Sequence, residues 1–413
     1  MGVPDAQCFN WREMVNNVYR EQRFCRLCSG NTLELVWDLG EQYLMDCVDD
    51  DDNGVTAPVV IVECSRCGLA QLAHTVDRER LYRHYWYRSG TSGTMRLALD
   101  AIANAAVGEV HEGGGVEQVV DIGANDGYLL SCFPPEWYKI GVEPSQIQPE
   151  GADTKIQNYF SYEHVAAGLD GPAKVVTSIA MFYDVDRPLD FMQDVADILH
   201  PQGVWINQMN YLPSCVSNNA FDFISHEHLT YWTLRTFDAA LSKVGLEVYK
   251  AEKLQINGGT IRMYIQHIGT RPKVGSDVHW SDSPVNWRGF RARVDDNGAR
   301  LVSLMAGKRV FAYGASTRGN SLLQYYGINS DQLECAADKD ERKWGKRMAG
   351  TGIPITSEDT ARQMQPDAFL VLPYSYAYEF VERERQYLER GGKFIIPLPN
   401  ATVLGAEALS YPP

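Results

Sequence analysis

The chain has 413 residues, of which 45% are hydrophobic and 22% charged, and this composition excludes general disorder. Its 38 Lys and Arg residues are outnumbered by 53 Asp and Glu, and the net charge of −15 argues against a nucleic-acid partner. The sequence contains neither an apolar run long enough to cross a membrane nor a signal-peptide pattern. We therefore expect a cytoplasmic protein of two or three domains with no membrane partner.

Two Cys-x-x-Cys pairs mark the first part of the chain, Cys25 with Cys28 and Cys64 with Cys67. Four thiolates presented by two tight turns can hold Zn²⁺ tetrahedrally, and a site closed by four thiolates leaves no position for a reactant. We predict a structural zinc in a small N-terminal module over residues 1–80, with four free buried thiols as the alternative. The acidic run at 49–52 lacks the ligand spacing of a calcium loop and predicts a solvated loop.

The rest of the chain alternates short apolar strands with helical segments. Residues 94–107 have helical periodicity and follow an aromatic cluster at 84–90. The predicted strands of the central part lie at 117–123, 138–144, 174–181 and 203–209, with a helix at 190–199. A helical passage at 276–307 precedes a second series of strands at 308–314, 332–340, 366–374 and 391–399. This alternation predicts an α/β fold with two doubly wound, Rossmann-like units, over residues 81–270 and 271–413.

The first predicted strand of the central unit ends in a loop that carries Asp121, Gly123, Asn125 and Gly127. Glycines allow the backbone to turn sharply and approach a ligand, and Glu143 at the end of the next strand can accept both hydroxyls of a ribose. The middle glycine of a dinucleotide fingerprint is missing, which S-adenosylmethionine tolerates because it has no pyrophosphate. We interpret 81–270 as a class I methyltransferase domain that binds this cofactor. A vestigial structural loop is the alternative.

The segment after the third predicted strand supports two inferences. One concerns the cofactor pocket, and the other concerns the class of methyl acceptor. Met181 and Phe182 in this segment are expected to border the sulfonium pocket, with ordinary core residues as the alternative. The segment lacks the Pro-Pro-aromatic motif of enzymes that methylate nucleic-acid amino groups, which agrees with the acidic charge.

The densest polar cluster in the sequence is at 221–231 and contains His226, Glu227 and His228. If this segment is extended, the two histidines face one side and the carboxylate the other. We interpret it as a general base with an orienting carboxylate. The alternatives are a metal site, for which His-x-His supplies two ligands, and histidines that only satisfy buried backbone groups.

The order of these motifs, with NGGTIR at 257–262 and AYGASTRGN at 312–320, resembles the S-adenosylmethionine-dependent C-methyltransferases of nucleotide-linked deoxysugars. The resemblance covers residues from about 25 to 400. It implies an NDP-4-keto-6-deoxy sugar as substrate, methylated at C3, with His228 as the enolising base beside Glu227. It also implies a sugar contact from Tyr85 or Tyr87, between which the sequence does not choose.

Other residues are expected to bind the nucleotide sugar. Family members often carry a tyrosine where this chain has Ser225 and a histidine where it has Tyr183, and both positions face the sugar in the family. The remaining candidates lie in the two motifs named above and at the end of the following strand: Asn257, Arg262, Tyr313, Arg318, Asn320 and Asp338. The C-terminal loop lacks the middle glycine of a dinucleotide site, which disfavours an oxidoreductase. An O- or N-methyltransferase of a small metabolite and a non-enzymatic scaffold remain alternatives, and we expect a monomer or homodimer.

Overall fold

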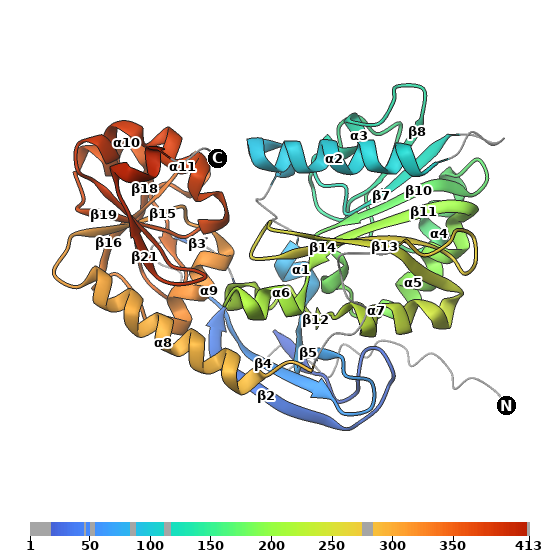
Figure 1. The fold of residues 1–413 in the computed structure, drawn as a ribbon, viewed down its shortest axis with the longest axis horizontal. Helices are drawn as coiled ribbons and strands as arrows, with labels where there is room; N and C mark the ends of the chain where they lie inside the picture. The colour runs from blue at the N-terminus through green and yellow to red at the C-terminus, as the bar shows by residue number, and fades with distance from the viewer. Residues whose placement is uncertain are drawn as a thin grey trace.

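The computed structural model describes residues 18–44, 47–49, 54–82, 88–110, 117–274 and 284–410. Tyr85 and Tyr87 lie outside the described residues, as does most of the acidic run at 49–52. Figure 1 shows an N-terminal module in blue below a central domain and a C-terminal domain, which stand side by side. None of the described helices combines the length and the hydropathy needed to cross a membrane.

The N-terminal module is built on antiparallel strands. Its strands and its helix are β1 (Tyr19–Glu21), β2 (Leu33–Tyr43), β3 (Cys47–Val48), β4 (Thr56–Cys64), β5 (Ala70–Leu72), β6 (His74–Val76) and α1 (Arg78–Tyr82). β4 alternates between buried and more exposed residues, as a strand with one face on a core should. β2, β4 and β5 form one sheet, and the strand that completes its order, β12-β5-β4-β2, comes from the central domain.

The central domain is a mixed sheet with the order β13-β14-β11-β10-β7-β8-β9. Its helices and strands are α2 (Gly93–Glu109), β7 (Gln118–Ile122), α3 (Tyr128–Ser131), β8 (Tyr138–Val142), β9 (Thr154–Ile156), α4 (Tyr162–Val165), β10 (Ala173–Ile179), α5 (Pro188–Ile198), β11 (Leu199–Asn210), α6 (Leu212–Ser217), β12 (Thr230–Tyr231), α7 (Leu234–Leu241), β13 (Leu246–Leu254) and β14 (Thr260–His267). β7 is buried along its whole length, as expected for a parallel strand covered on both faces. The four strands predicted from the sequence are β7, β8, β10 and β11. The antiparallel hairpin of β13 and β14 and the short edge strand β9 were not predicted.

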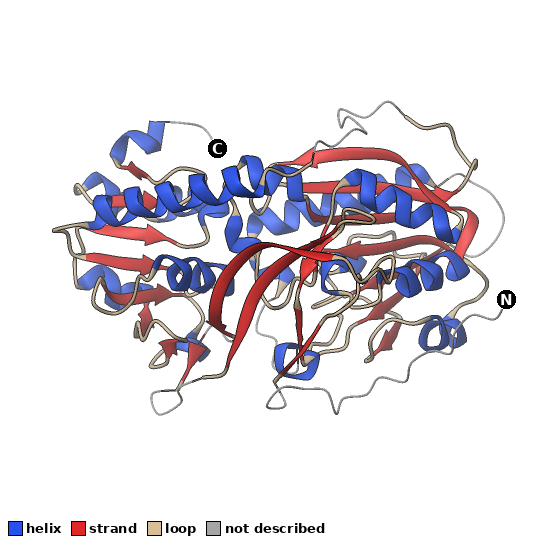
Figure 2. Ribbon diagram, turned by 90° about the horizontal axis from the view of Figure 1, so that it is seen from below, coloured by secondary structure: helices blue, strands red, loops and turns tan. Residues whose placement is uncertain are grey.

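The C-terminal domain is a second α/β unit, whose sheet has the order β18-β16-β15-β19-β20-β21. Its elements are α8 (Trp287–Met305), β15 (Val310–Tyr313), α9 (Thr317–Tyr326), β16 (Leu333–Asp338), β17 (Arg347–Met348), β18 (Ile355–Ser357), α10 (Glu358–Gln363), β19 (Ala368–Val371), α11 (Ala377–Arg383), α12 (Arg385–Glu389), β20 (Lys393–Ile396) and β21 (Thr402–Leu404). The strands of this sheet are parallel except for β21. Seen from below, they lie between helices (Figure 2), which agrees with the predicted fold class.

The three units share packing and strand pairs. β12 of the central domain pairs with β5 of the N-terminal module, and β3 of that module pairs with β17 of the C-terminal domain. The ring of Trp37 in β2 meets the ring of Phe290 in α8 edge to face, with centroids 5.2 Å apart. The N-terminal module therefore touches both other units, and the loops at the carboxyl ends of their strands meet between them.

Candidate active site

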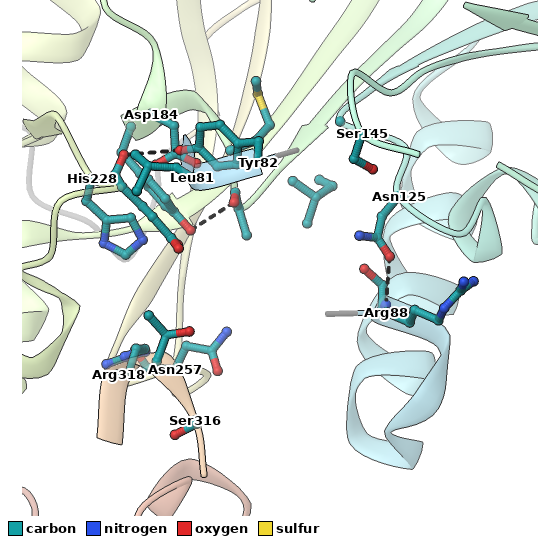
Figure 3. A pocket seen from close by; sticks show the side chains of 18 of the residues that line it. Leu81, Tyr82, Arg88, Asn125, Ser145, Asp184, His228, Asn257, Ser316 and Arg318 are labelled. Carbon is teal, nitrogen blue, oxygen red and sulfur yellow. Dashed lines mark hydrogen bonds between the residues drawn. The ribbon is translucent and has the colours of Figure 1, made fainter. Parts of the chain in front are cut away.

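A cavity of about 1320 Å³ lies where the loops of the two α/β domains meet the edge of the N-terminal module. Most of the residues singled out from the sequence line it: Asp121, Gly123, Asn125, Glu143, Met181, Tyr183, Glu227, His228, Asn257, Tyr313, Arg318 and Asp338. In the view of Figure 3, His228 lies on one side, Asn125 and Ser145 lie on the opposite side, and Arg318 and Asn257 lie below His228. The arrangement brings the predicted cofactor loop and the predicted base to one cavity.

The loop after β7 is held by the carboxylate at the end of β8. Gly123 has φ +75°, and its N–H donates to the carbonyl of Val142 at 2.8 Å. Glu143 accepts the N–H of Asn125 on Oε2 at 2.9 Å and the N–H of Ser145 on Oε1 at 2.8 Å. A carboxylate offers about four lone-pair sites, so both oxygens can accept further hydrogen bonds from a ligand.

Gly127 has a different role from the one predicted. Its φ is +79°, and a Cβ at this position would lie 2.0 Å from the carbonyl oxygen of Glu150. Gly127 does not line the cavity. The glycine is required because another part of the backbone passes close to it, so the prediction that it lets the chain approach a ligand is wrong.

A second carboxyl group lies beside the loop. Asp121 is buried at the end of β7 and accepts a hydrogen bond from the hydroxyl of Thr177 at 2.6 Å. Burial raises the pKa of Asp121 to about 7, the bond from Thr177 lowers it and the charge of Glu143 raises it. On the outer side, the Asn125 side chain accepts the N–H of Ser89 at 3.0 Å (Figure 3). The loop therefore fixes the segment that follows residues 83–87.

The segment with the two histidines is a reverse turn and not an extended strand. The N–H of His228 donates to the carbonyl of Ser225 at 3.2 Å, which closes the turn. Nε2 of His226 is 2.8 Å from the carbonyl oxygen of Ala57 in β4, so this ring faces the N-terminal module. Glu227 and His228 both line the cavity, and His226 does not. The prediction that both histidines face one side is wrong, because the turn separates them.

Ser225 also lies away from the cavity. It lines a small neighbouring pocket beside Tyr43 and Gln324, which shares Leu44, Glu227 and Thr317 with the cavity. The turn places Ser225 and His226 at the interface between the N-terminal module and α9. The expectation that Ser225 faces the substrate is therefore wrong for this structure.

The geometry around His228 defines its tautomer. Nδ1 of His228 forms a hydrogen bond with the carbonyl oxygen of Phe223, which can only accept. Nδ1 therefore carries the proton and Nε2 has the free lone pair. The ring of Tyr183 packs edge to face on the imidazole with centroids 4.2 Å apart. Burial, with a smaller contribution from the charge of Arg318, lowers the pKa of His228 to about 3, so the ring is neutral at physiological pH.

Asp184 is a cavity residue that the sequence did not single out. Its pKa is raised well above the usual value by burial and by the charge of Glu227, while a hydrogen bond with Tyr82 acts in the opposite direction. Tyr183, the preceding residue, donates its hydroxyl to the carbonyl of Ala180 at 2.9 Å. One short segment after β10 thus places a ring on His228 and a carboxyl group beside Glu227. An isolated aspartate in a turn gives no signal of this kind in the sequence.

Arg318 reaches from the C-terminal domain to the central domain. Its Nε donates to Oδ2 of Asp222 at 2.9 Å and its Nη1 to the carbonyl of Asn257 at 2.9 Å. The hydroxyl of Tyr374 donates to the other oxygen of Asp222 at 3.0 Å. Asp222 directly precedes Phe223, whose carbonyl holds His228. Neither Asp222 nor Tyr374 was predicted, because their roles depend on contacts about 100 residues or more apart in sequence.

The other predicted substrate residues divide into two groups. Tyr313 lines the cavity, and its hydroxyl donates to Glu384 at 2.7 Å. Asp338 lines it too, and its carboxylate accepts the N–H groups of Ala315 and Asp340, both at 2.8 Å. Arg262 and Asn320 do not line the cavity, so their expected substrate contact is wrong for this structure. They bond within the protein instead: Arg262 donates to Gln208 at 2.9 Å, and Asn320 donates to the carbonyl of Ala349 at 3.1 Å.

Comparison with known proteins agrees with this geometry. Family models match a zinc binding domain at residues 25–82, a methyltransferase domain at 77–251 and a C-methyltransferase C-terminal domain at 255–399. The chain is 28% identical to the C-methyltransferase NovU of Streptomyces niveus over 420 residues, which are 95% of this chain and 100% of NovU. The chain therefore resembles zinc-containing C-methyltransferases in each of its three parts. It is an S-adenosylmethionine-dependent enzyme.

Solved methyltransferase structures match only part of this C-methyltransferase. The CcbJ methyltransferase of Streptomyces caelestis is 11% identical, with a TM-score of 0.31, over 44% of this chain and 99% of that one. The plantazolicin methyltransferase BpumL, in complex with SAH, is 12% identical, with a TM-score of 0.33, over 42% of this chain and 83% of that one. The similarity to C-methyltransferases is a finding of the sequence matches.

The four predicted zinc ligands fit a metal ion. The sulfur atoms of Cys25, Cys28, Cys64 and Cys67 all lie within 4.8 Å of one another. The Cys25–Cys67 and Cys28–Cys64 pairs are 3.5 and 3.6 Å apart, close to the distance of about 3.8 Å that tetrahedral Zn–S bonds require. Each Cys-x-x-Cys sequence lies in a turn closed by a backbone hydrogen bond, from Ser29 to Cys25 in the first and from Gly68 to Cys64 in the second. The cluster lies in the N-terminal module, outside the cavity, as expected for a structural zinc.

One residue connects this cluster to the active site. Arg26, between Cys25 and Cys28, is buried, and its Nε donates to Oδ1 of Asp186 at 3.1 Å. Asp186 follows Tyr183 and Asp184 in the segment beside His228. The turn that holds the zinc ligands therefore also supports one wall of the cavity.

Proposed function

We propose that this enzyme methylates the carbon next to the ketone of an NDP-4-keto-6-deoxy sugar, at C3, after enolisation by His228. The observation that carries the proposal is the state of His228. Its Nδ1–H is committed to Phe223, its ring is neutral, and it lines one cavity with both the cofactor loop and the C-terminal domain. A neutral imidazole with a free Nε2 is suited to removing a proton from a carbon acid. The similarity to NovU, a C-methyltransferase, supports the same chemistry.

The reaction requires two changes in bonding. Nε2 of His228 takes the proton from the carbon beside the ketone, and the electrons of that C–H bond form an enolate. S-adenosylmethionine, when bound, supplies an electrophilic methyl group, and transfer of that group to the carbon leaves S-adenosylhomocysteine and restores the ketone. The loop residues Asp121, Gly123, Asn125 and Met181 with Glu143 would hold this cofactor, with the carboxylate of Glu143 facing the ribose. Glu227 would orient the substrate or the turn that carries His228.

The size of the cavity and its basic side chains support a nucleotide sugar as the second ligand. A volume of about 1320 Å³ exceeds the range of roughly 300–1,000 Å³ that is usual for one ligand. The C-terminal side of the cavity is lined by Lys339, Arg342, Lys343 and Arg383, and Arg342 and Arg383 are paired with the lining carboxylates Asp340 and Glu358. Hydrogen bonds from these cations, rather than a net positive charge, would hold a diphosphate. We assign the zinc module to residues 1–80, the cofactor domain to 81–270 and the nucleotide-binding domain to 271–413. Tyr313, Asn257 and Asp338 would contribute to the nucleotide-sugar site.

The proposed function is tested by isotope exchange. The enzyme is incubated in D₂O with dTDP- and GDP-linked 4-keto-6-deoxyhexoses, without the methyl donor, and the sugar is analysed by mass spectrometry and NMR. We expect one deuterium at the carbon beside the ketone, and C-methylation there once S-adenosylmethionine is added. Methylation on oxygen or nitrogen without deuterium uptake would instead show an O- or N-methyltransferase that uses His228 to deprotonate a heteroatom. The proposal is overturned if the enzyme neither exchanges deuterium into any of these sugars nor methylates any of them.

A further inference from the structure

One cation of the C-terminal domain, Arg318, lies at the end of the cavity that is lined by the proposed base, His228. Arg318 lines the same cavity as His228, and its charge contributes to the lowered pKa of that histidine. Figure 3 shows Arg318 and Asn257 on the side of the cavity that carries His228. An arginine in this place can act on the reacting part of the substrate, whereas the sequence predicted only a contact with the nucleotide sugar.

The guanidinium group of Arg318 is held in a fixed orientation. Asp222 accepts its Nε–H, the carbonyl of Asn257 accepts one N–H of Nη1, and the hydroxyl of Tyr374 lies 3.4 Å from Nη2. Asp222 is only 2% exposed, so this charge pair is shielded from bulk water. A rigid, charge-paired guanidinium needs little reorganisation when a negative charge develops beside it.

The same group keeps donors for a ligand. A guanidinium has five N–H groups, and the three bonds above leave one on each Nη without a partner among the described residues. The Arg318 side chain is 26% exposed, and the residue lines the cavity. Donors are therefore available on the surface that a substrate beside His228 would contact.

We propose that Arg318 stabilises the enolate oxygen that forms when His228 removes the proton. The inference rests on the proposed function, because it requires a carbonyl beside the carbon that loses the proton. In that step the C–H electrons become the C=C bond and the carbonyl π electrons move to oxygen. Arg318 donates N–H bonds to this oxygen and keeps its own protons. Asp222 is a positioning residue, because its two oxygens are bonded to Arg318 and Tyr374 and it acts through the guanidinium group that it orients.

The main variant of the test leaves no unpaired buried carboxylate at Asp222. Arg318→Gln with Asp222→Asn removes both charges together, and Asp222→Asn alone is the matched control that keeps the arginine. Deuterium uptake into the keto sugar and kcat should fall by about 10²- to 10³-fold in the double variant. KM should change much less, and thermal unfolding and cofactor affinity by calorimetry should stay near those of the control.

Two further measurements separate catalysis from structure. In Arg318→Ala with Asp222→Asn, added guanidinium ion at millimolar concentration should restore part of the exchange rate, because it can occupy the vacated space. Loss of Arg318 should also raise the pKa of His228, so the acidic limb of kcat/KM should move to higher pH. A third variant, Arg318→Lys, keeps the positive charge but lacks the planar pair of N–H donors. It should therefore be less active than the unmodified enzyme.

The outcomes decide both proposals separately. If the unmodified enzyme exchanges deuterium and the double variant exchanges it as fast, the role of Arg318 is refuted and the enolisation mechanism stands. If the double variant loses exchange only together with cofactor affinity or folding, and guanidinium ion does not rescue it, Arg318 is a structural residue and the proposal fails. If the unmodified enzyme shows no exchange, the proposed function itself fails.

Discussion

The two α/β domains use the same device to hold the loop after their first strand, and they use it for different purposes. In the central domain Gly123 donates to Val142, and Glu143 accepts the N–H of Asn125. In the C-terminal domain Gly314 donates to Ala337 at 2.7 Å, and Asp338 accepts the N–H of Ala315. The carboxylate at the end of the neighbouring strand therefore fixes each loop.

The difference appears four residues after each loop glycine. The central loop has Gly127, which lies against the backbone of Glu150, whereas the C-terminal loop has Arg318, which reaches Asp222 in the other domain. Two residues before the glycine, the central domain has buried Asp121 and the C-terminal domain has Ala312. The comparison teaches that one loop is shaped to surround a ligand and the other to join its domain to the segment that holds His228.

The largest effect is expected where the two regions meet, at His228. His228→Ala should lower activity by about 10²- to 10⁴-fold, because the general base is lost. Deuterium exchange into the sugar should disappear, while affinity for S-adenosylmethionine, measured by calorimetry, should stay unchanged. His226→Gln is the control, since His226 bonds to Ala57 outside the cavity. Exchange by His228→Ala together with loss of exchange by His226→Gln would assign the base to the other histidine.

The next effect tests the special position of Gly127. Gly127→Ala should destabilise the protein by about 3 kcal/mol or more, because a positive φ costs about 1–2 kcal/mol and the Cβ would overlap the Glu150 carbonyl. Gly307 is a matched control, with φ +70° and no atom within 4 Å of the place that a Cβ would occupy. Gly307→Ala should cost only about 1–2 kcal/mol in denaturant unfolding. Equal losses in the two variants would show that the close approach at Gly127 is relaxed in solution.

A smaller effect separates the functions of the two carboxylates. Glu143→Gln and Asp338→Asn each lose one of two backbone bonds, so their stabilities should fall by similar amounts. Only Glu143→Gln should weaken S-adenosylmethionine binding, by about 10- to 100-fold, because bonds to a charged acceptor contribute about 1.5–3 kcal/mol. Calorimetric titration of both variants checks this. Equal affinities in both variants would show that the ribose is held elsewhere.

The comparison also shows what the sequence could predict. Strand ends, loop glycines and Cys-x-x-Cys spacing are local patterns. They predicted both α/β units and the four zinc ligands, and most of the candidate site residues that they indicated line the cavity. The orientation of a side chain within a short turn depends on contacts with segments that are distant in sequence, so no local pattern predicts it. His226, Ser225 and Gly127 were placed wrongly because each faces a segment that is distant in sequence or in a separate loop.

The residues that the sequence missed have the same physical origin. Asp222 pairs with Arg318, which is 96 positions away, and the pKa of Asp184 is raised by burial and, to a smaller extent, by the charge of Glu227 in another loop. Neither aspartate is part of a spacing pattern. Such groups become visible only when tertiary structure brings charges together in a buried place, and they are the groups most sensitive to that environment.

The smallest effect concerns Asp121, which has no counterpart in the C-terminal loop. Burial raises its pKa to about 7 from 3.8, so between these values the folded protein holds a proton that the unfolded chain has lost. Its contribution to stability is fully present below pH 3.8 and is lost as the pH rises through about 7. Asp121→Asn cannot titrate, and its amide oxygen can still accept the bond from Thr177. The stability of the native protein relative to this variant should therefore fall by about 1.4 kcal/mol for each pH unit between pH 5 and 6. Denaturant unfolding of both proteins without ligand measures this difference, from which the titration of all other groups cancels. Parallel stability curves would mean that Asp121 is ionised throughout, and that the like charge of Glu143 beside it is balanced in another way.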